Sequence, residues 1–235
     1  MELDDDAPQQ HASVELPTPV SKDGDVEVAA EPEQEAPEEL DAETRARRDA
    51  ALQHVRKFGD PVLRATALPV ERFDGELQEE VARMGELMRD ALGVGLAATQ
   101  LGVLHRVLVY KAYAEEPLTA LVNPVLEWVS DERETAEEGC LSLPGVHVEV
   151  ERHAQVRVRA QDEQGRPLQV EAEGLPARVI QHEIDHLDGT LILDRISREA
   201  RKEAMRAMRE AREHPDRHAH ERRDGQSQAA AADAA

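Results

Sequence analysis

The spacing of apolar residues along the chain predicts three helices. In residues 76–92, apolar side chains recur every three or four positions, which is the period of an amphipathic helix, and Gly93 is well placed to end it. Residues 176–187 contain no helix breaker after their first position. Ser197 can cap a last helix over residues 198–213. The folded part of the chain is therefore expected to have helices near its beginning, its middle and its end.

Shorter stretches of the chain have the alternating or β-branched pattern that is typical of strands. They cover residues 106–111, 121–128, 146–150, 156–158 and 168–172. Short strands lying among three helices favour an α+β fold with mainly antiparallel pairing. We expect antiparallel sheets packed around a central helix, with one helix on its N-terminal side and another at the C-terminal end.

Composition divides the chain into a folded part and two tails. Residues 1–44 are rich in acidic residues and proline and contain no aromatic residue, so we expect a disordered acidic tail. Residues 45–57 form a mixed-charge lead-in, and residues 58–196 form a globular domain. Residues 197–213 are the C-terminal helix, and residues 214–235 are expected to be a second disordered tail.

Charge and residue usage exclude several classes of protein. The formal net charge of −22 reflects the acidic tail more than the domain, and it argues against DNA or RNA binding by the whole chain. No apolar run approaches the length of a membrane-spanning helix, and the N-terminus has the pattern of neither a secretory signal nor a transit peptide. Cys140 is the single cysteine, so an internal disulfide cannot form. We expect a cytoplasmic protein.

The clearest chemical signal is the H-E-x-x-H sequence of residues 182–186. On a helix, residues four apart lie on one face, so His182 and His186 can bind one metal ion. Glu183 follows the first histidine and can act as a base toward a water at that ion. Histidines at this spacing are also common as surface pairs, so the motif by itself leaves both interpretations open.

A catalytic metal site usually needs a third protein ligand, and Cys140 is the candidate. A free cysteine is also a common small residue of protein cores. Gly139 permits close approach of the backbone, and Leu141 offers a backbone N–H one residue from the sulfur. A bound metal would hold the thiol in its deprotonated form. These features favour the ligand interpretation.

A glycine-rich run at residues 93–100 is a second candidate for function. It is too short for the dinucleotide-binding fingerprint and follows a predicted helix, so we do not expect a phosphate site. Its small residues can let backbone lie against an extended peptide. Gln100 at its end offers an amide donor.

Residues 93–100, 138–142 and 181–186 together resemble the three signature motifs of the peptide deformylase family. They occur in the order of that family and at similar separations, and the resemblance covers about residues 58–196. It implies a metal-dependent hydrolase that removes the N-formyl group from formylmethionine at the N-terminus of nascent polypeptides. The reaction releases formate and belongs to N-terminal processing in protein biosynthesis.

The same resemblance implies a role for each motif residue. It places one divalent metal ion per chain on the cysteine and the two histidines named above, with Fe²⁺ as the native ion of the family. Such ligands also accept Zn²⁺, Ni²⁺ or Co²⁺. Glu183 would take a proton from the attacking water and pass it to the departing amine. The Gln100 amide and the Leu141 backbone N–H would hold the developing oxyanion.

A pocket for the methionine side chain is expected beside the H-E-x-x-H motif. Leu175 and Val179 fall on the same helix face as the two histidines. They can line this pocket together with Val94, Gly95 and Gly139, or simply pack in the core.

Two expectations concern charged residues that have no expected role in the reaction itself. Glu138, next to the ligand loop, needs a cation, and Arg152 in the following strand is the expected partner. The predicted C-terminal helix interleaves basic and acidic residues, for which a solvated surface is the default interpretation. Because similar family members dock near the ribosomal exit tunnel through a basic C-terminal helix, ribosome docking is kept as a hypothesis.

Two other functions use the same residues. A zinc endopeptidase can carry H-E-x-x-H, but its third ligand usually lies downstream, where Asp188 and Asp194 are the candidates. A catalytically silent relative could bind nascent chains without turnover. The presence of Glu183 and Gln100 argues against that alternative.

Overall fold

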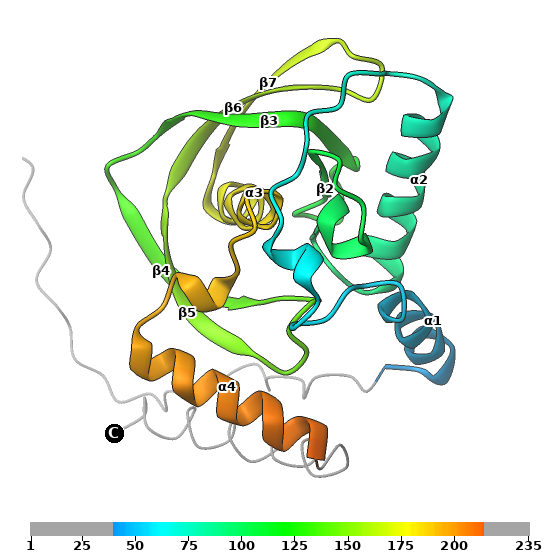
Figure 1. The fold of residues 1–235 in the computed structure, drawn as a ribbon. Coiled ribbons are helices and arrows are strands. Elements are labelled where there is room, and N and C mark those ends of the chain that lie inside the picture. Colours follow the sequence, from blue (N-terminus) through cyan, green and yellow to red (C-terminus); the bar gives the residue numbers. More distant parts are fainter. Residues whose placement is uncertain (1–39, 214–235) are drawn as a thin grey trace, which may run out of the picture. The chain divides into compact units, whose positions relative to one another are not determined.

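The computed structural model describes the backbone of residues 40–213 and the side chains of residues 40–210 (Figure 1). The predicted disordered tails therefore lie outside the described residues, except at residues 40–44. There the helix α1 (Ala42–Leu52) already begins, because the Asp41 side chain accepts a hydrogen bond from the Thr44 backbone N–H at 2.9 Å. The predicted lead-in is thus largely helical.

Seven strands form two sheets in this part of the chain, and all named strand pairs are antiparallel. The larger sheet has the order β1-β2-β3-β6-β7, with the bounds β1 (Gly95–Ala97), β2 (Val107–Tyr110), β3 (Thr119–Val129), β6 (Gln155–Gln161) and β7 (Pro167–Glu173). The smaller sheet pairs β4 (Arg133–Gly139) with β5 (His147–His153).

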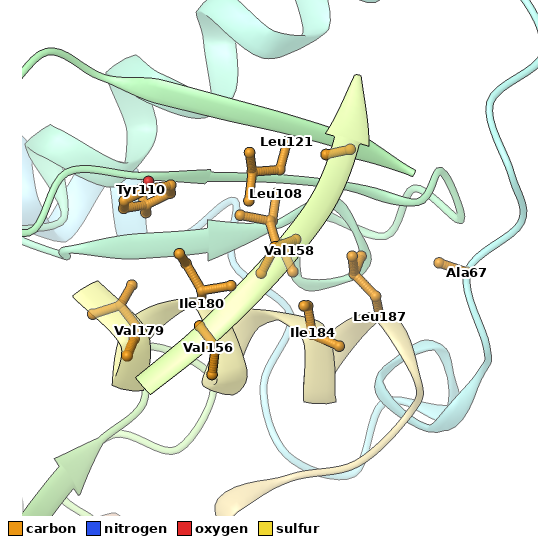
Figure 2. Packing of buried hydrophobic residues seen from close by; sticks show 13 residues of the cluster. Ala67, Leu108, Tyr110, Leu121, Val156, Val158, Val179, Ile180, Ile184 and Leu187 are labelled. Carbon is orange, nitrogen blue, oxygen red and sulfur yellow. The ribbon is translucent and has the colours of Figure 1, made fainter. Parts of the chain in front are cut away.

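Helix α3 (Gly174–Leu187) is the central helix of the fold (Figure 1). Its apolar residues Ile180, Ile184 and Leu187 are buried in one cluster with residues of β2, β3 and β6 (Figure 2). Burying such aliphatic side chains contributes roughly 1.5–3 kcal/mol each. This packing fixes α3, and with it the motif histidines, against the larger sheet.

The opposite face of β1 and β2 packs against α2 (Gly75–Asp90). Successive side chains of a strand point to opposite faces, so Val107 and Val109 face α2 while Leu108 and Tyr110 face α3. The predicted helix at residues 76–92 is confirmed, but its end differs. Leu92, with a φ of 59°, takes the left-handed position that glycine usually occupies.

Gly93 follows one position later and contributes to the end of α2 through a backbone hydrogen bond. Its N–H donates to the Met88 carbonyl oxygen at 2.9 Å, and the Leu92 N–H donates to the Arg89 carbonyl oxygen at 3.0 Å. These two bonds form a Schellman motif, which satisfies carbonyls at the helix end. Leu92 remains half exposed at the start of the glycine-rich run.

Helix α4 (Arg198–Glu213) follows a short turn of 3-10 helix at Ile192–Asp194. It packs through Ala204 and Met208 into a third buried cluster, which also contains Leu143 and Val150. The chain is thus an α+β protein with antiparallel sheets and four α-helices among residues 40–213. None of those helices combines the length and the apolar character needed to cross a bilayer.

Candidate metal centre

Cys140, His182 and His186 come together in space. One ligand atom from each residue lies within 4.8 Å of those of the other two. Both histidines project from α3, and Cys140 directly follows the last residue of β4. The Cys140 Sγ lies 3.2 Å from the His186 Nε2, and the two imidazole rings are 5.0 Å apart at an angle of 66°. A thiolate and two imidazoles in this arrangement are a donor set for a transition-metal ion.

The protein also fixes the ring of His182 from behind. Its Nδ1 lies 2.9 Å from the Glu138 Oε2, so this nitrogen carries the proton and Nε2 is the one available to a metal. Although burial lowers the pKa of His182, the contacts with Cys140 and Glu138 outweigh it and raise the pKa well above its ordinary value. His186 is fully buried, and burial together with the charge of His182 holds its pKa well below the usual range.

Glu138 is the centre of a buried ion-pair network that supports the candidate centre. Arg152 donates to both of its carboxylate oxygens, each at 2.9 Å, which confirms the predicted pair. Arg178 of α3 donates to the Glu138 Oε1 at 2.8 Å, a contact that no local sequence pattern predicts. Burial alone would raise the pKa of Glu138, but Arg152 and His182 lower it to about 2. The carboxylate therefore stays ionised behind His182.

The network continues to the other side of α3. Arg152 donates to the Asp185 Oδ2 at 2.5 Å, and Arg195 also donates to both oxygens of Asp185. Asp185 is the residue just before His186. Arg152 of β5 thus pairs with both Glu138 and Asp185, and its pairing with Asp185 holds the histidine-bearing turn of α3 against β5.

Glu183 lies in the same site and is almost completely buried. Its Oε2 has no hydrogen-bond partner among residues 40–210, and burial raises its pKa to about 7. Gly95 of β1 lies directly against it, because a Cβ at position 95 would be 2.5 Å from the Glu183 Oε1 and 2.8 Å from Val179. The glycine leaves room for the carboxyl group.

The polar end of Gln100 points toward the sulfur. The Gln100 Oε1 accepts a hydrogen bond from the Ala97 N–H at 2.9 Å, which turns the Nε2 toward Cys140 at 3.9 Å and the Ser142 Oγ at 3.3 Å. Gln100 itself is buried. The Gln100 amide and the loop at residues 140–142, which contains Leu141, therefore face the same space.

A cavity of about 540 Å³ opens in front of these residues. Its walls include the predicted site residues other than His186, namely Val94, Gly95, Gln100, Gly139, Cys140, Leu141, Leu175, Val179, His182 and Glu183. His186 lies behind the wall. Val179 belongs both to the wall and to the core, whereas Leu175 and Val94 are exposed at the rim.

The fold and the site together define a class of protein. An α+β chain that gathers a thiol and two imidazoles beside a buried carboxyl group has the arrangement of a metal-dependent hydrolase. The polypeptide deformylase family matches residues 52–202. The chain belongs to the peptide deformylase family and is an enzyme of that activity.

Individual relatives agree with this assignment. The peptide deformylase of Parafrankia sp. (strain EAN1pec) is 47% identical over 161 residues, which cover 68% of this chain and 87% of that protein. The enzyme of Thermotoga neapolitana is 50% identical over 145 residues, covering 62% and 87% of the two chains.

Solved structures are similar as well. The peptide deformylase of Synechococcus elongatus in complex with actinonin is 42% identical, with a TM-score of 0.63 over 65% of this chain and 85% of that one. The enzyme of Thermotoga maritima is 47% identical, with a TM-score of 0.59 over 61% of this chain and 96% of that one.

Proposed function

We propose that Cys140, His182 and His186 hold one divalent metal ion and that the residues around them remove the formyl group of N-formylmethionyl nascent peptides. The observation that supports this proposal best is the meeting of the three ligand atoms, within 4.8 Å, beside the buried Glu183. The donor set fits a metal because the Glu138 carboxylate orients one imidazole and the thiol lies within reach of the other.

A divalent ion bound there supplies a Lewis acid, which makes water more acidic and polarises the formyl carbonyl. We propose Fe²⁺ as the native ion. A thiolate with two imidazoles also accepts Zn²⁺, Ni²⁺ and Co²⁺, so elemental analysis of protein purified without oxygen decides between them.

Glu183 is the proposed general base and acid. Its Oε2 has no partner among the described residues, so it is free to accept the proton of the attacking water. A pKa of about 7 suits a carboxyl group that takes up a proton in one step and releases it in the next. In the second step the proton goes to the nitrogen of the departing amine, and formate is released.

Gln100 and Leu141 are the proposed oxyanion donors. The bond from the Ala97 N–H holds the Gln100 side chain with its amide hydrogens toward the cavity. The Leu141 N–H belongs to the residue after Cys140. Donors fixed in advance stabilise the charge that develops on the formyl oxygen without having to reorganise.

The methionine side chain is proposed to lie against Leu175 and Val179, beside Val94, Gly95 and Gly139. All five line the cavity, and Val179 presents an apolar surface next to Glu183. The formyl group, which is bonded to the α-amino nitrogen of the same methionine, would then lie near the proposed base.

Formate release from a formylmethionyl peptide tests the function. The metal-loaded full chain should hydrolyse formyl-Met-Ala-Ser, should lose activity on chelation and should regain it with Fe²⁺. Cleavage of casein without formate release would instead identify an endopeptidase. Peptide binding without either product would identify a catalytically silent relative.

We also propose that the enzyme works in the cytoplasm and docks on the ribosome through α4, where nascent chains emerge. The exposed side of α4 carries basic residues, including Arg198, Lys202 and Arg209. Anionic ribosomal RNA attracts such residues. Co-sedimentation of the full chain with ribosomes, but not of a chain lacking residues 197–235, is the expected result. Equal sedimentation of the two would contradict docking through α4.

A further inference from the structure

The cavity in front of the candidate metal centre has a wall formed by helix α1, most of which precedes the residues that the family match covers. Arg48 and Leu52 of helix α1 line the same cavity as Cys140 and Leu141. The match to the family begins at residue 52, so Arg48 lies outside the matched residues.

Helix α1 packs against α2. Ala51 is buried, and Val55 just beyond the helix is buried as well. Arg48 and Leu52 are four residues apart and therefore share one helix face, the one that borders the cavity. The Arg48 side chain is thus carried by an anchored element and not by a free end.

The charge of Arg48 is not neutralised within the described structure. Among residues 40–210, its guanidinium makes no hydrogen bond and no ion pair, although Arg48 is partly buried. Arg178, which lines the same cavity, is different, because it donates to Glu138 and to the carbonyl oxygens of Val150 and Glu134.

A second positive charge lies nearby. Burial lowers the pKa of Lys57, the nearby Cys140 raises it, and the positive charge of Arg48 lowers it, as expected for two cations that repel one another. The acidic residues that line the cavity do not offset Arg48. Glu138 is already paired with Arg152 and Arg178, and Glu183 is buried. The Glu137 carboxylate lies 3.4 Å from His147.

We propose that Arg48 makes the enzyme selective for substrates that carry a carboxylate a few residues after the formylmethionine. The inference rests on the proposed function, because the peptide must lie in this cavity with its formyl group at the metal. The carboxylate is either an Asp or Glu side chain or the C-terminus of a short peptide, and a guanidinium binds both in the same way. Leu52 supplies an apolar surface beside it for the aliphatic part of that residue.

Peptide series with one changed residue test the proposal. The substrates are formyl-Met-Ala-Xaa-Ala and formyl-Met-Xaa-Ala-Ala, C-terminally amidated, with Xaa as Glu, Gln or Lys. A free-acid version of each Gln peptide distinguishes a terminal carboxylate from a side-chain carboxylate. The metal-loaded full chain is assayed at low salt, and kcat/KM is compared between peptides within each variant, so that differences in folded fraction cancel.

We expect the Glu peptide to exceed the Gln peptide by about three- to tenfold in at least one series, as for a partly exposed charge pair. Arg48→Ala should bring this ratio close to one, and Arg48→Glu should reverse the order of the Glu and Lys peptides. Arg47→Ala is the matched control, because Arg47 is exposed on the same helix and does not line the cavity. It should retain the wild-type ratio.

The outcomes separate the two proposals. No formate from any of the peptides would overturn the proposed function and this inference with it. Formate from all of them with equal kcat/KM for Glu, Gln and free-acid peptides would overturn only the role of Arg48. An equal loss of selectivity in the Arg47 and Arg48 variants would also overturn it, since the effect would then come from net charge alone.

Discussion

The Lys57 ammonium group donates a hydrogen bond to the Leu141 carbonyl oxygen at 3.0 Å, across 84 positions of the sequence. The next residue, Phe58, donates its N–H to the Ser142 carbonyl oxygen at 2.9 Å. The start of the domain therefore holds the two residues that follow Cys140. Because the Leu141 N–H is a proposed oxyanion donor, Lys57 is a positioning residue for that donor.

Replacing Lys57 by Met should lower kcat for formate release by roughly three- to tenfold, the scale of the net contribution of one typical hydrogen bond. KM should change little, since Lys57 does not line the cavity, and kcat is compared at full metal loading because the charge of Lys57 also acts on Cys140. Steady-state kinetics and elemental analysis measure these quantities. Lys57→Arg, which retains a cationic donor, should recover most of the rate. An unchanged kcat in the Met variant would remove Lys57 from this role.

Glu183→Ala should reduce turnover by about 10²- to 10⁴-fold, the usual contribution of a general base. The three proposed metal ligands remain, so the variant should bind one equivalent of metal. Formate release and metal analysis of the same preparation give both values. Near-normal turnover in a fully loaded variant would exclude Glu183 as the base.

Gly95→Ala should damage the site while leaving the fold in place. The added Cβ would lie 2.5 Å from the Glu183 Oε1, so the carboxyl group has to move, and we expect kcat/KM to fall at least about tenfold. Gly85→Ala is the matched control. Its Cβ would meet only the flexible end of the Leu118 side chain, 2.3 Å away and partly exposed. Activity close to wild type in both variants would show that Glu183 tolerates the displacement.

Glu138→Gln should weaken both metal binding and stability. His182 loses the carboxylate that orients it, which costs about 10- to 100-fold in metal affinity. Arg178 loses its carboxylate partner among the described residues, while Arg152 keeps Asp185, so the free energy of unfolding of the metal-free protein should fall by about 3–5 kcal/mol. Metal titration and denaturant unfolding test the two effects independently. A metal affinity equal to that of wild type would show that His182 needs no such support.

Acid should destabilise the wild-type protein more than the Asp194→Asn variant. Burial raises the pKa of Asp194, but the hydrogen bonds and charges of Arg64 and Arg201 outweigh burial and lower this pKa below its unfolded value. A group with a lowered folded pKa contributes stability above its unfolded pKa and loses it as the pH falls through the folded pKa. The loss should therefore lie between about pH 5 and pH 2. Thermal unfolding of both proteins over this range measures the difference, and parallel curves would exclude the contribution of Asp194.

Helices α2, α3 and α4 and most strands were predictable from the sequence because each has an apolar face that repeats with its own period, whereas α1 lies in the mixed-charge lead-in and was not predicted as a helix. Strand β4 was not, since Arg133–Gly139 is almost entirely polar and exposed and is a strand only through its pairing with β5. Strand β1 is three buried residues inside the glycine-rich run, too short for any alternation to be visible.

The site likewise contains some features that the sequence predicts and others that depend on tertiary packing. The H-E-x-x-H spacing predicts that His182 and His186 share a helix face, because that is local geometry. The contacts of Arg178 with Glu138 and of Lys57 with Leu141 depend on how α3 and the start of the domain are placed against the ligand loop. The paired residues are separated by 40 and by 84 positions in the sequence, so no local sequence pattern predicts these contacts. The position of Arg48 at the cavity was not predicted for the same reason, because it depends on how α1 packs against the rest of the domain.

Cys140, at the wall of the cavity, is also the only sulfhydryl in the entire chain. A thiol-specific alkylating reagent that the protein consumes therefore reports on a single atom, and its uptake with and without a chelator counts the molecules whose sulfur is ligated. The same fact leaves the enzyme exposed to peroxide. A sulfenic acid formed there has no second cysteine in the molecule with which to form a reversible disulfide, so repair must come from outside or the oxidation proceeds to irreversible products.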